Sequence, residues 1–148
     1  MTDNKKKIYL ASPFFNELEI AIYREVINNL RNVGYSVYVP QEHEIKNGWK
    51  LSNADWANKV FDEDIKAIHE CDTVMVLNFG MYSDSGTAWE SGFALALGKE
   101  CVQVLCGCEN AVYSLMMVNG CHKVIHLDDV AHWEEESAKV NLSKIIQK

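Results

Sequence analysis

The sequence lacks the features that mark several large classes of protein. No apolar run is long enough to cross a bilayer, and the lysines at positions 5–7 lead into a short strand pattern, unlike a signal peptide. Lys and Arg number 14 against 21 Asp and Glu, which gives a net charge of −7. A nucleic-acid partner would need a basic face, which this net charge does not favour. Neither a membrane nor a nucleic acid is therefore expected as a partner.

The cysteines also lack the spacing of a metal site or a disulfide framework. There are five of them and no CxxC pair: Cys71, Cys101, Cys106, Cys108 and Cys121. An odd number without paired spacing predicts reduced thiols in a cytoplasmic protein. The CxC pair near Cys121 and His122 is therefore interpreted as buried structural thiols, and no metal is expected.

What the sequence does contain is a regular alternation of strand and helix patterns, with 48% hydrophobic and 24% charged residues. Strands are predicted at 7–11, 35–39, 73–79, 101–106 and 123–127, and helices at 16–33, 54–71, 87–99 and 128–146. This alternation predicts one α/β domain over residues 1–148. We expect a doubly wound, five-stranded parallel sheet, flavodoxin-like or Rossmann-like, with strand order 2-1-3-4-5.

The stretch SDSGTAWESGFALALGK follows the apolar run at 73–79 and begins the third predicted helix. Thr87 and Glu90 have the spacing of a capping box, so Glu90 lies about one turn into the helix, near the carboxyl end of a central strand. One interpretation is that Glu90 only caps its own helix. Asp84, six residues earlier, favours acid/base chemistry instead, because two acids in one turn serve catalysis better than stability.

The loops that follow the strands converge on one edge of such a sheet, where open α/β sheets bind ligands. The segments 12–16, 41–44, 80–85 and 107–114 contain no lysine or arginine and no glycine-rich phosphate loop. We therefore expect a neutral ligand with an aromatic part that Phe14, Phe15 or Trp49 can stack on. A nucleoside fits this description better than a nucleotide. The polar loop at 41–53 is typical of a lid or a binding loop.

Several motifs in the same order resemble the nucleoside 2-deoxyribosyltransferases along nearly the whole chain. They are KIYLASPFF, YVP, FDEDIKAIHECD, DSGTAWESGFALALGK and SLMM. The resemblance implies an enzyme of nucleoside salvage that exchanges the base of a 2′-deoxynucleoside. It would form a covalent deoxyribosyl–enzyme intermediate and retain the anomeric configuration, by the logic of retaining glycosidases. No cofactor is implied.

The resemblance also assigns roles to four residues. Glu90 matches the nucleophile, and Asp84 and Asp64 match the two acids that handle the base. Tyr9 matches a tyrosine that contacts the nucleophilic carboxylate. Without the resemblance, Asp64 is interpreted as a solvated helix residue beside two other acids, and Tyr9 as an ordinary core tyrosine.

The substrate-binding residues that the resemblance implies are Ser12, Phe14, Phe15, Gly86, Ser114 and Met116. We expect Phe14 to face the base and Phe15 to pack inward. Ser114 stands where relatives commonly have asparagine, and Ser12 where many have glycine, so both bear on substrate preference. The segment that contains Ser114 and Met116 is expected to complete the site of a neighbouring subunit in a homo-oligomer.

Three other functions stay open at this point. The same glutamate would serve a nucleoside or nucleotide N-glycoside hydrolase, with water as the acceptor. A non-catalytic nucleoside-binding module is the second alternative, and a flavodoxin-like flavin or phosphate binder, which the ASPFFN segment does not support, is the third. The sequence also leaves open the base preference, the size of the oligomer, and which of Gln41, Glu42 and Glu44 contacts the base.

Overall fold

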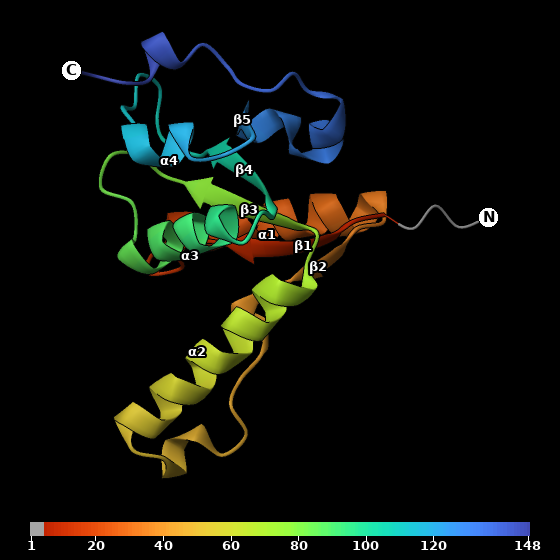
Figure 1. The fold of residues 1–148 in the computed structure, drawn as a ribbon, viewed down its shortest axis with the longest axis vertical. Helices are drawn as coiled ribbons and strands as arrows, with labels where there is room; N and C mark the ends of the chain where they lie inside the picture. The colour runs from red at the N-terminus through yellow and green to blue at the C-terminus, as the bar shows by residue number, and fades with distance from the viewer. Residues whose placement is uncertain (1–4) are drawn as a thin grey trace.

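The computed structural model describes residues 5–148, in which five parallel strands lie between helices (Figure 1). The strand order β2-β1-β3-β4-β5 confirms the predicted doubly wound α/β sheet. The strands are β1 (Lys7–Ala11), β2 (Ser36–Tyr38), β3 (Thr73–Asn78), β4 (Glu100–Leu105) and β5 (Lys123–His126). The α-helices are α1 (Glu17–Val33), α2 (Asn53–Glu70), α3 (Ser85–Ala96) and α4 (Leu115–Asn119), and the 3₁₀ helices are η1 (Pro40–Glu42), η2 (Gly48–Lys50), η3 (Leu127–Glu135) and η4 (Leu142–Lys144).

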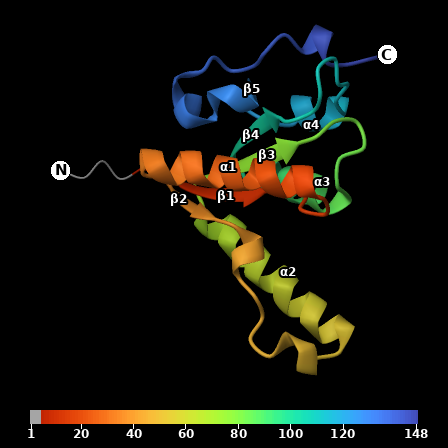
Figure 2. The ribbon, with the colours of Figure 1, turned by 180° about the vertical axis from the view of Figure 1, so that it is seen from behind.

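Each face of the sheet buries its own apolar cluster. Ile8 and Leu10 of β1 face α1 and η3, and Figure 2 shows α1 in front of the sheet. Tyr9 lies between them on β1 and faces the opposite way, toward α2, α3 and α4. All of β3 is buried, as expected of a parallel strand that is covered on both sides. Packing on both faces of the sheet therefore holds the carboxyl ends of β1 and β3 in fixed positions.

Helix α2 differs from its predicted packing. The expected buried face consisted of Trp56, Val60, Phe61, Ile65 and Ile68. Of these only Ile68 is buried, while Trp56 and Phe61 are 47% and 52% exposed. The reason is that the amino-terminal part of α2 extends past the sheet edge, together with the preceding loop (Figure 1). We call residues 40–66, which form this projection, the arm.

The predicted helix at 128–146 is wrong. Residues 127–135 form η3, the backbone then runs beside β5 with a parallel bridge between Val124 and Lys139, and η4 follows. This course covers the outer edge of β5, which a helix would have left unpaired. The segment at 109–120, for which no regular structure was expected, contains α4.

The cysteines form no disulfide, and Cys71, Cys101, Cys106 and Cys121 are buried, as predicted for structural thiols. The prediction is wrong for Cys108, which is exposed in the loop after β4. Burial raises the pKa of Cys101 and of Cys106 to about 12, so neither thiol is reactive near neutral pH. No helix between residues 5 and 148 has the length and apolarity needed to cross a membrane.

Candidate active site

The turn between β3 and α3 corrects the predicted capping box. Helix α3 begins at Ser85, two residues before the predicted start, and Asp84 is its N-cap. Asp84 Oδ2 accepts hydrogen bonds from the Thr87 backbone N–H (2.8 Å) and from the Thr87 hydroxyl (2.9 Å). Since Asp84 caps the helix, Glu90 does not, and its carboxylate is available for another role.

A cavity of about 770 Å³ lies between the arm, the loop after β1 and the start of α3. It brings together three of the four predicted catalytic residues, Asp64, Asp84 and Glu90. Its other lining residues are Ser12, Phe14, Pro40, Gln41, His43, Glu44, Ile45, Gly48, Trp49, Leu51, Asn53, Trp56, Val60 and Thr87. Its volume suits a ligand the size of a nucleoside.

Glu90 and the fourth predicted residue, Tyr9, present buried polar atoms to each other without a formed hydrogen bond. Between residues 5 and 148, Glu90 Oε2, Tyr9 Oη and Trp133 Nε1 are the buried side-chain atoms that lack a hydrogen-bond partner. Burial, helped by the charges of Asp64 and Asp84, raises the pKa of Glu90 to about 7, although the nearby Tyr9 hydroxyl acts in the opposite direction. Buried polar groups without partners are uncommon, and those that border a cavity, as Glu90 does, are candidates for a functional role.

Asp64 on α2 is half-buried, unlike the solvated residue of the alternative interpretation. Burial, followed by the charge of Glu63, raises the pKa of Asp64 to about 6, and His43 lowers it. The His43 ring stacks on Tyr38 with 4.2 Å between centroids, and Tyr38 stacks on Tyr9 at 5.5 Å. This aromatic stack fixes the start of the arm against β1.

A second, largely apolar cavity of about 330 Å³ also borders Asp64 and Glu90. Its lining residues are Phe61, Asp64, Ile65, Ile68, Gly86, Trp89 and Glu90. Gly86, a predicted substrate-binding residue, therefore lines this second cavity. Asp64 and Glu90 are the residues common to both cavities.

Phe14 and Phe15, the two predicted aromatic contacts, differ in whether they line the large cavity. Phe14 lines the large cavity, as expected. The expectation that Phe15 packs inward is wrong, since Phe15 is 74% exposed and stacks on the outer side of Phe14 with ring centroids 5.5 Å apart. Both residues lie in the bend before α1, beyond the edge of the sheet, where no core is available to Phe15.

Of the three candidates for base contact in the loop after β2, two line the large cavity and one does not. Gln41 and Glu44 line the large cavity, and Gln41 Nε2 donates to the Ser12 carbonyl oxygen (3.2 Å). Glu42 does not line it, because Arg31 Nη1 donates to Glu42 Oε2 (3.1 Å) and holds that carboxylate elsewhere. His43 was not among the predicted site residues.

Ser114 and Met116 line neither cavity within one chain. Ser114 is the residue before α4, and Met116 on that helix is 75% exposed. Their positions leave them free to contact another molecule.

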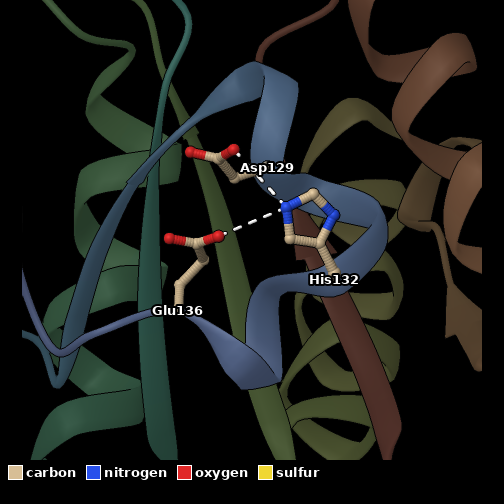
Figure 3. Close-up of side chains that lie close together, drawn as sticks. All are labelled: Asp129, His132 and Glu136. Carbon is tan, nitrogen blue, oxygen red and sulfur yellow. Dashed lines mark ion pairs between the residues drawn. The ribbon is translucent and has the colours of Figure 1, made fainter.

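A separate group of ligand-type side chains lies on and just after η3 (Figure 3). His132 Nε2 lies 3.2 Å from Glu136 Oε1 and 3.5 Å from Asp129 Oδ1. The η3 segment packs on the α1 face of the sheet, across the sheet from the helices that carry Asp64 and Glu90. Ion pairs between partly exposed side chains account for this group.

Fold and cavity together define a doubly wound α/β protein whose acids gather at the carboxyl edge of a parallel sheet, an arrangement suited to acid/base chemistry. The family described as nucleoside 2-deoxyribosyltransferase matches residues 8–142, and the chain belongs to that family. Family membership indicates an enzyme that acts on nucleosides. A comparison with curated proteins gives no match.

Solved structures with the same fold include a 2-deoxyribosyltransferase from Bacillus psychrosaccharolyticus, 28% identical, with a TM-score of 0.76 over 96% of this chain and 97% of that one. A conserved protein from Enterococcus faecalis is 20% identical, with a TM-score of 0.61 over 95% and 96% of the two chains. A CMP N-glycosidase from Clostridium botulinum is 22% identical, with a TM-score of 0.59 over 88% and 98%. At their lower identities, the last two show the fold alone.

The raised pKa of Glu90 predicts an unusual pH dependence of stability. Burial keeps Glu90 protonated in the folded protein at pH values where Glu90 of the unfolded chain is already ionised. The free energy of unfolding therefore decreases as pH rises from about 4.5 to about 7. Glu90→Gln removes this decrease, because glutamine does not ionise. Urea unfolding should find the variant more stable than wild type by about 1–3 kcal/mol near pH 8, and nearly equal to it near pH 4. Glu25→Gln, at an exposed position on α1, is the control, and an equal pH dependence for wild type and Glu90→Gln would contradict the prediction.

Proposed function

We propose that the protein is a nucleoside 2-deoxyribosyltransferase that exchanges the base of 2′-deoxynucleosides through a covalent intermediate on Glu90. The observation that carries this proposal is the Glu90 carboxylate, which lines the large cavity with a buried oxygen that no protein group satisfies. A structural carboxylate at this depth would be paired, whereas a nucleophile needs a free lone pair facing its substrate.

In the first step a Glu90 oxygen attacks C1′ of the sugar, a C–O bond forms, and the C1′–N bond to the base breaks with its electron pair. Attack requires the ionised carboxylate, and with a pKa of about 7 a substantial fraction of Glu90 is ionised near neutral pH. The Tyr9 hydroxyl, which has no other partner, can donate to that carboxylate and hold it in one orientation.

The departing base carries the bond electrons and needs a proton. Asp64, with its pKa of about 6, keeps a protonated fraction near neutral pH and can supply one. Asp84 binds Thr87 through Oδ2, and Oδ1 makes no hydrogen bond with that residue, so it can contact the base. Phe14 at the cavity wall supplies an apolar face for stacking.

In the second step a nitrogen of a different base attacks C1′, the ester bond to Glu90 breaks, and the incoming base loses its proton to the same acids. Two inversions restore the original configuration, as in retaining glycosidases. Nucleoside salvage is the physiological role that such an exchange would serve.

Hydrolysis is the second candidate function. It uses the same Glu90 intermediate, with water in place of the incoming base. The similarity in fold to a CMP N-glycosidase favours keeping this candidate, and the choice depends on which acceptor reaches C1′ first.

The proposed mechanism predicts that Glu90→Gln lowers the rate of base exchange by at least about 10³-fold, because an amide cannot form the intermediate. The assay mixes a 2′-deoxynucleoside with a different free base and follows the products by chromatography. A new nucleoside identifies transfer, and free sugar with free base identifies hydrolysis. Glu25→Gln should exchange bases at the wild-type rate, and undiminished turnover by Glu90→Gln would exclude the proposed nucleophile.

The charges of the cavity predict a preference for uncharged nucleosides. Glu44, Asp64, Asp84 and Glu90 line the large cavity, and no lysine or arginine between residues 5 and 148 does so. A 5′-phosphate would lie among carboxylates without a cation to pair with. The ratio kcat/KM should therefore be at least about 10-fold higher for a deoxynucleoside than for its 5′-monophosphate. A higher ratio for the monophosphate would contradict this expectation.

We further propose that the protein works as a homo-oligomer in which Ser114 and Met116 complete a neighbour's site. Both residues lie outside the two cavities of their own chain, and Met116 is 75% exposed, which supports this proposal. Glu90→Gln and Met116→Asp should each be inactive alone. Co-refolding the two should restore activity, because some subunits keep Glu90 and receive an intact Met116. A mixture of Glu90→Gln with Glu90→Ala is the control and should stay inactive; absence of recovery in the first mixture would refute a shared site.

A further inference from the structure

Two amide side chains lie completely buried in the sheet beneath α3. Asn78 ends β3 and Gln103 lies on β4, and both are 0% exposed. Asn78 Nδ2 donates to Gln103 Oε1 at 3.1 Å. The neighbouring strand positions on this face, such as Val76 and Cys101, are apolar. Since buried amides are costly unless they are paired, the position of this pair calls for an explanation beyond packing.

Each amide also binds a residue directly beside one of the proposed catalytic acids. Asn78 Oδ1 accepts from the Gly80 backbone N–H (3.1 Å). The Ser83 hydroxyl lies 2.7 Å from the Gly80 carbonyl oxygen and 2.9 Å from Asn78 Oδ1, so Ser83, which precedes Asp84, is joined to Asn78 directly or through Gly80. Gln103 Nε2 donates to Ser91 Oγ at 2.8 Å, and Ser91 follows Glu90. One connected chain of hydrogen bonds therefore runs from the residue before Asp84, through the sheet, to the residue after Glu90.

This series of hydrogen bonds fixes the positions of Ser83 and Ser91, which backbone hydrogen bonding alone leaves adjustable. Ser83 lies in an irregular turn, and the hydrogen bonds within α3 do not by themselves specify how the helix is oriented over the strands. Directional bonds in a dry interior remove that freedom, because each partner that shifts leaves a buried polar atom unsatisfied. Asn78 Nδ2 also approaches Met117 Sδ of α4 (3.9 Å), so the same pair contacts a third element.

We propose that the buried pair of Asn78 and Gln103 is a positioning device that sets the distance and orientation between Glu90 and Asp84. This proposal rests on the proposed function of those two acids. Neither amide reaches the substrate cavities, so both act through Ser83 and Ser91. Two carboxylates with different roles at one sugar carbon need placement to a fraction of an ångström, which such a link supplies.

The first test compares Gln103→Met with a matched control, Thr73→Val. Methionine has nearly the length of glutamine and no hydrogen-bonding amide. Thr73 is equally buried, lies at the opposite end of β3 and donates to Glu100 Oε1 (2.8 Å). Both variants should melt at a lower temperature than wild type. Only in Gln103→Met should kcat fall, by about 10- to 100-fold, with a smaller change in KM.

The double variant Gln103→Met/Ser91→Ala separates positioning from stability. Removing the Ser91 hydroxyl relieves one of the two unsatisfied groups, so the melting temperature should recover in part, since Asn78 Nδ2 still lacks the Gln103 acceptor. The loss of kcat should persist, because the link between β4 and α3 is still missing. Recovery of kcat together with stability would reduce the pair to a structural role and overturn the proposal.

A measurement without substrate keeps this test independent of the proposed reaction. Carbon-13 NMR of labelled glutamate carboxyls, with Glu90 assigned from the Glu90→Gln spectrum, reports the pKa of Glu90 directly. In Gln103→Met this pKa should fall toward the ordinary value, because a loosened α3 exposes the carboxyl to water. In Thr73→Val it should stay unchanged. An unchanged pKa of Glu90 in folded Gln103→Met would overturn the positioning proposal even if the protein transfers no base at all.

Discussion

Removal of the Glu90 carboxylate from water is the constraint on which the site depends. An ionised group loses its hydration when it is buried, and here no protein partner replaces that hydration in full. This depth is possible because the side of α3 that faces the sheet consists of the small residues Thr87, Ser91 and Ala94, which bring the helix close to the strands. A larger residue at any of these positions would lift α3 and let water reach the carboxylate.

Much of the fold could be predicted, because each central strand is an apolar run and the first helix has clear ends. Asn16 caps the start of α1, and Gly34 ends it in the left-handed conformation, with a φ of 107°. The prediction failed where apolar residues had two ways to become buried. Val140, in the extended run beside β5, and Ile145, in the turn after η4, pack against the α2–α4 face, where one continuous helix was predicted. In α2, a helical period predicted a buried face, but periodicity does not reveal whether the sheet extends far enough to cover it.

The acids of the site could be predicted from the motifs, and the structure brings Asp64, Asp84 and Glu90 to one cavity. Which residue caps α3 could not be predicted, because Asp84 and Thr87 are both good N-cap residues and only the backbone path selects one. His43 lies in the loop at 41–44 that was expected at this edge, but no role was predicted for it. Its place beside Asp64 depends on its stacking with Tyr38, a contact between a loop and a strand that no local pattern encodes.

The arm has a consequence for how this scaffold can diversify. Residues 40–66 supply much of the wall of the large cavity, yet the carboxyl-terminal end of α2, around Ala67 and Ile68, contributes the buried residues of that helix. Insertions or substitutions farther out therefore alter the ligand-facing wall at little cost in folding free energy. Evolution and protein engineering can both reshape which molecules enter, while Asp84 and Glu90 stay at the start of α3, outside the arm, and Asp64 stays near the buried end of α2.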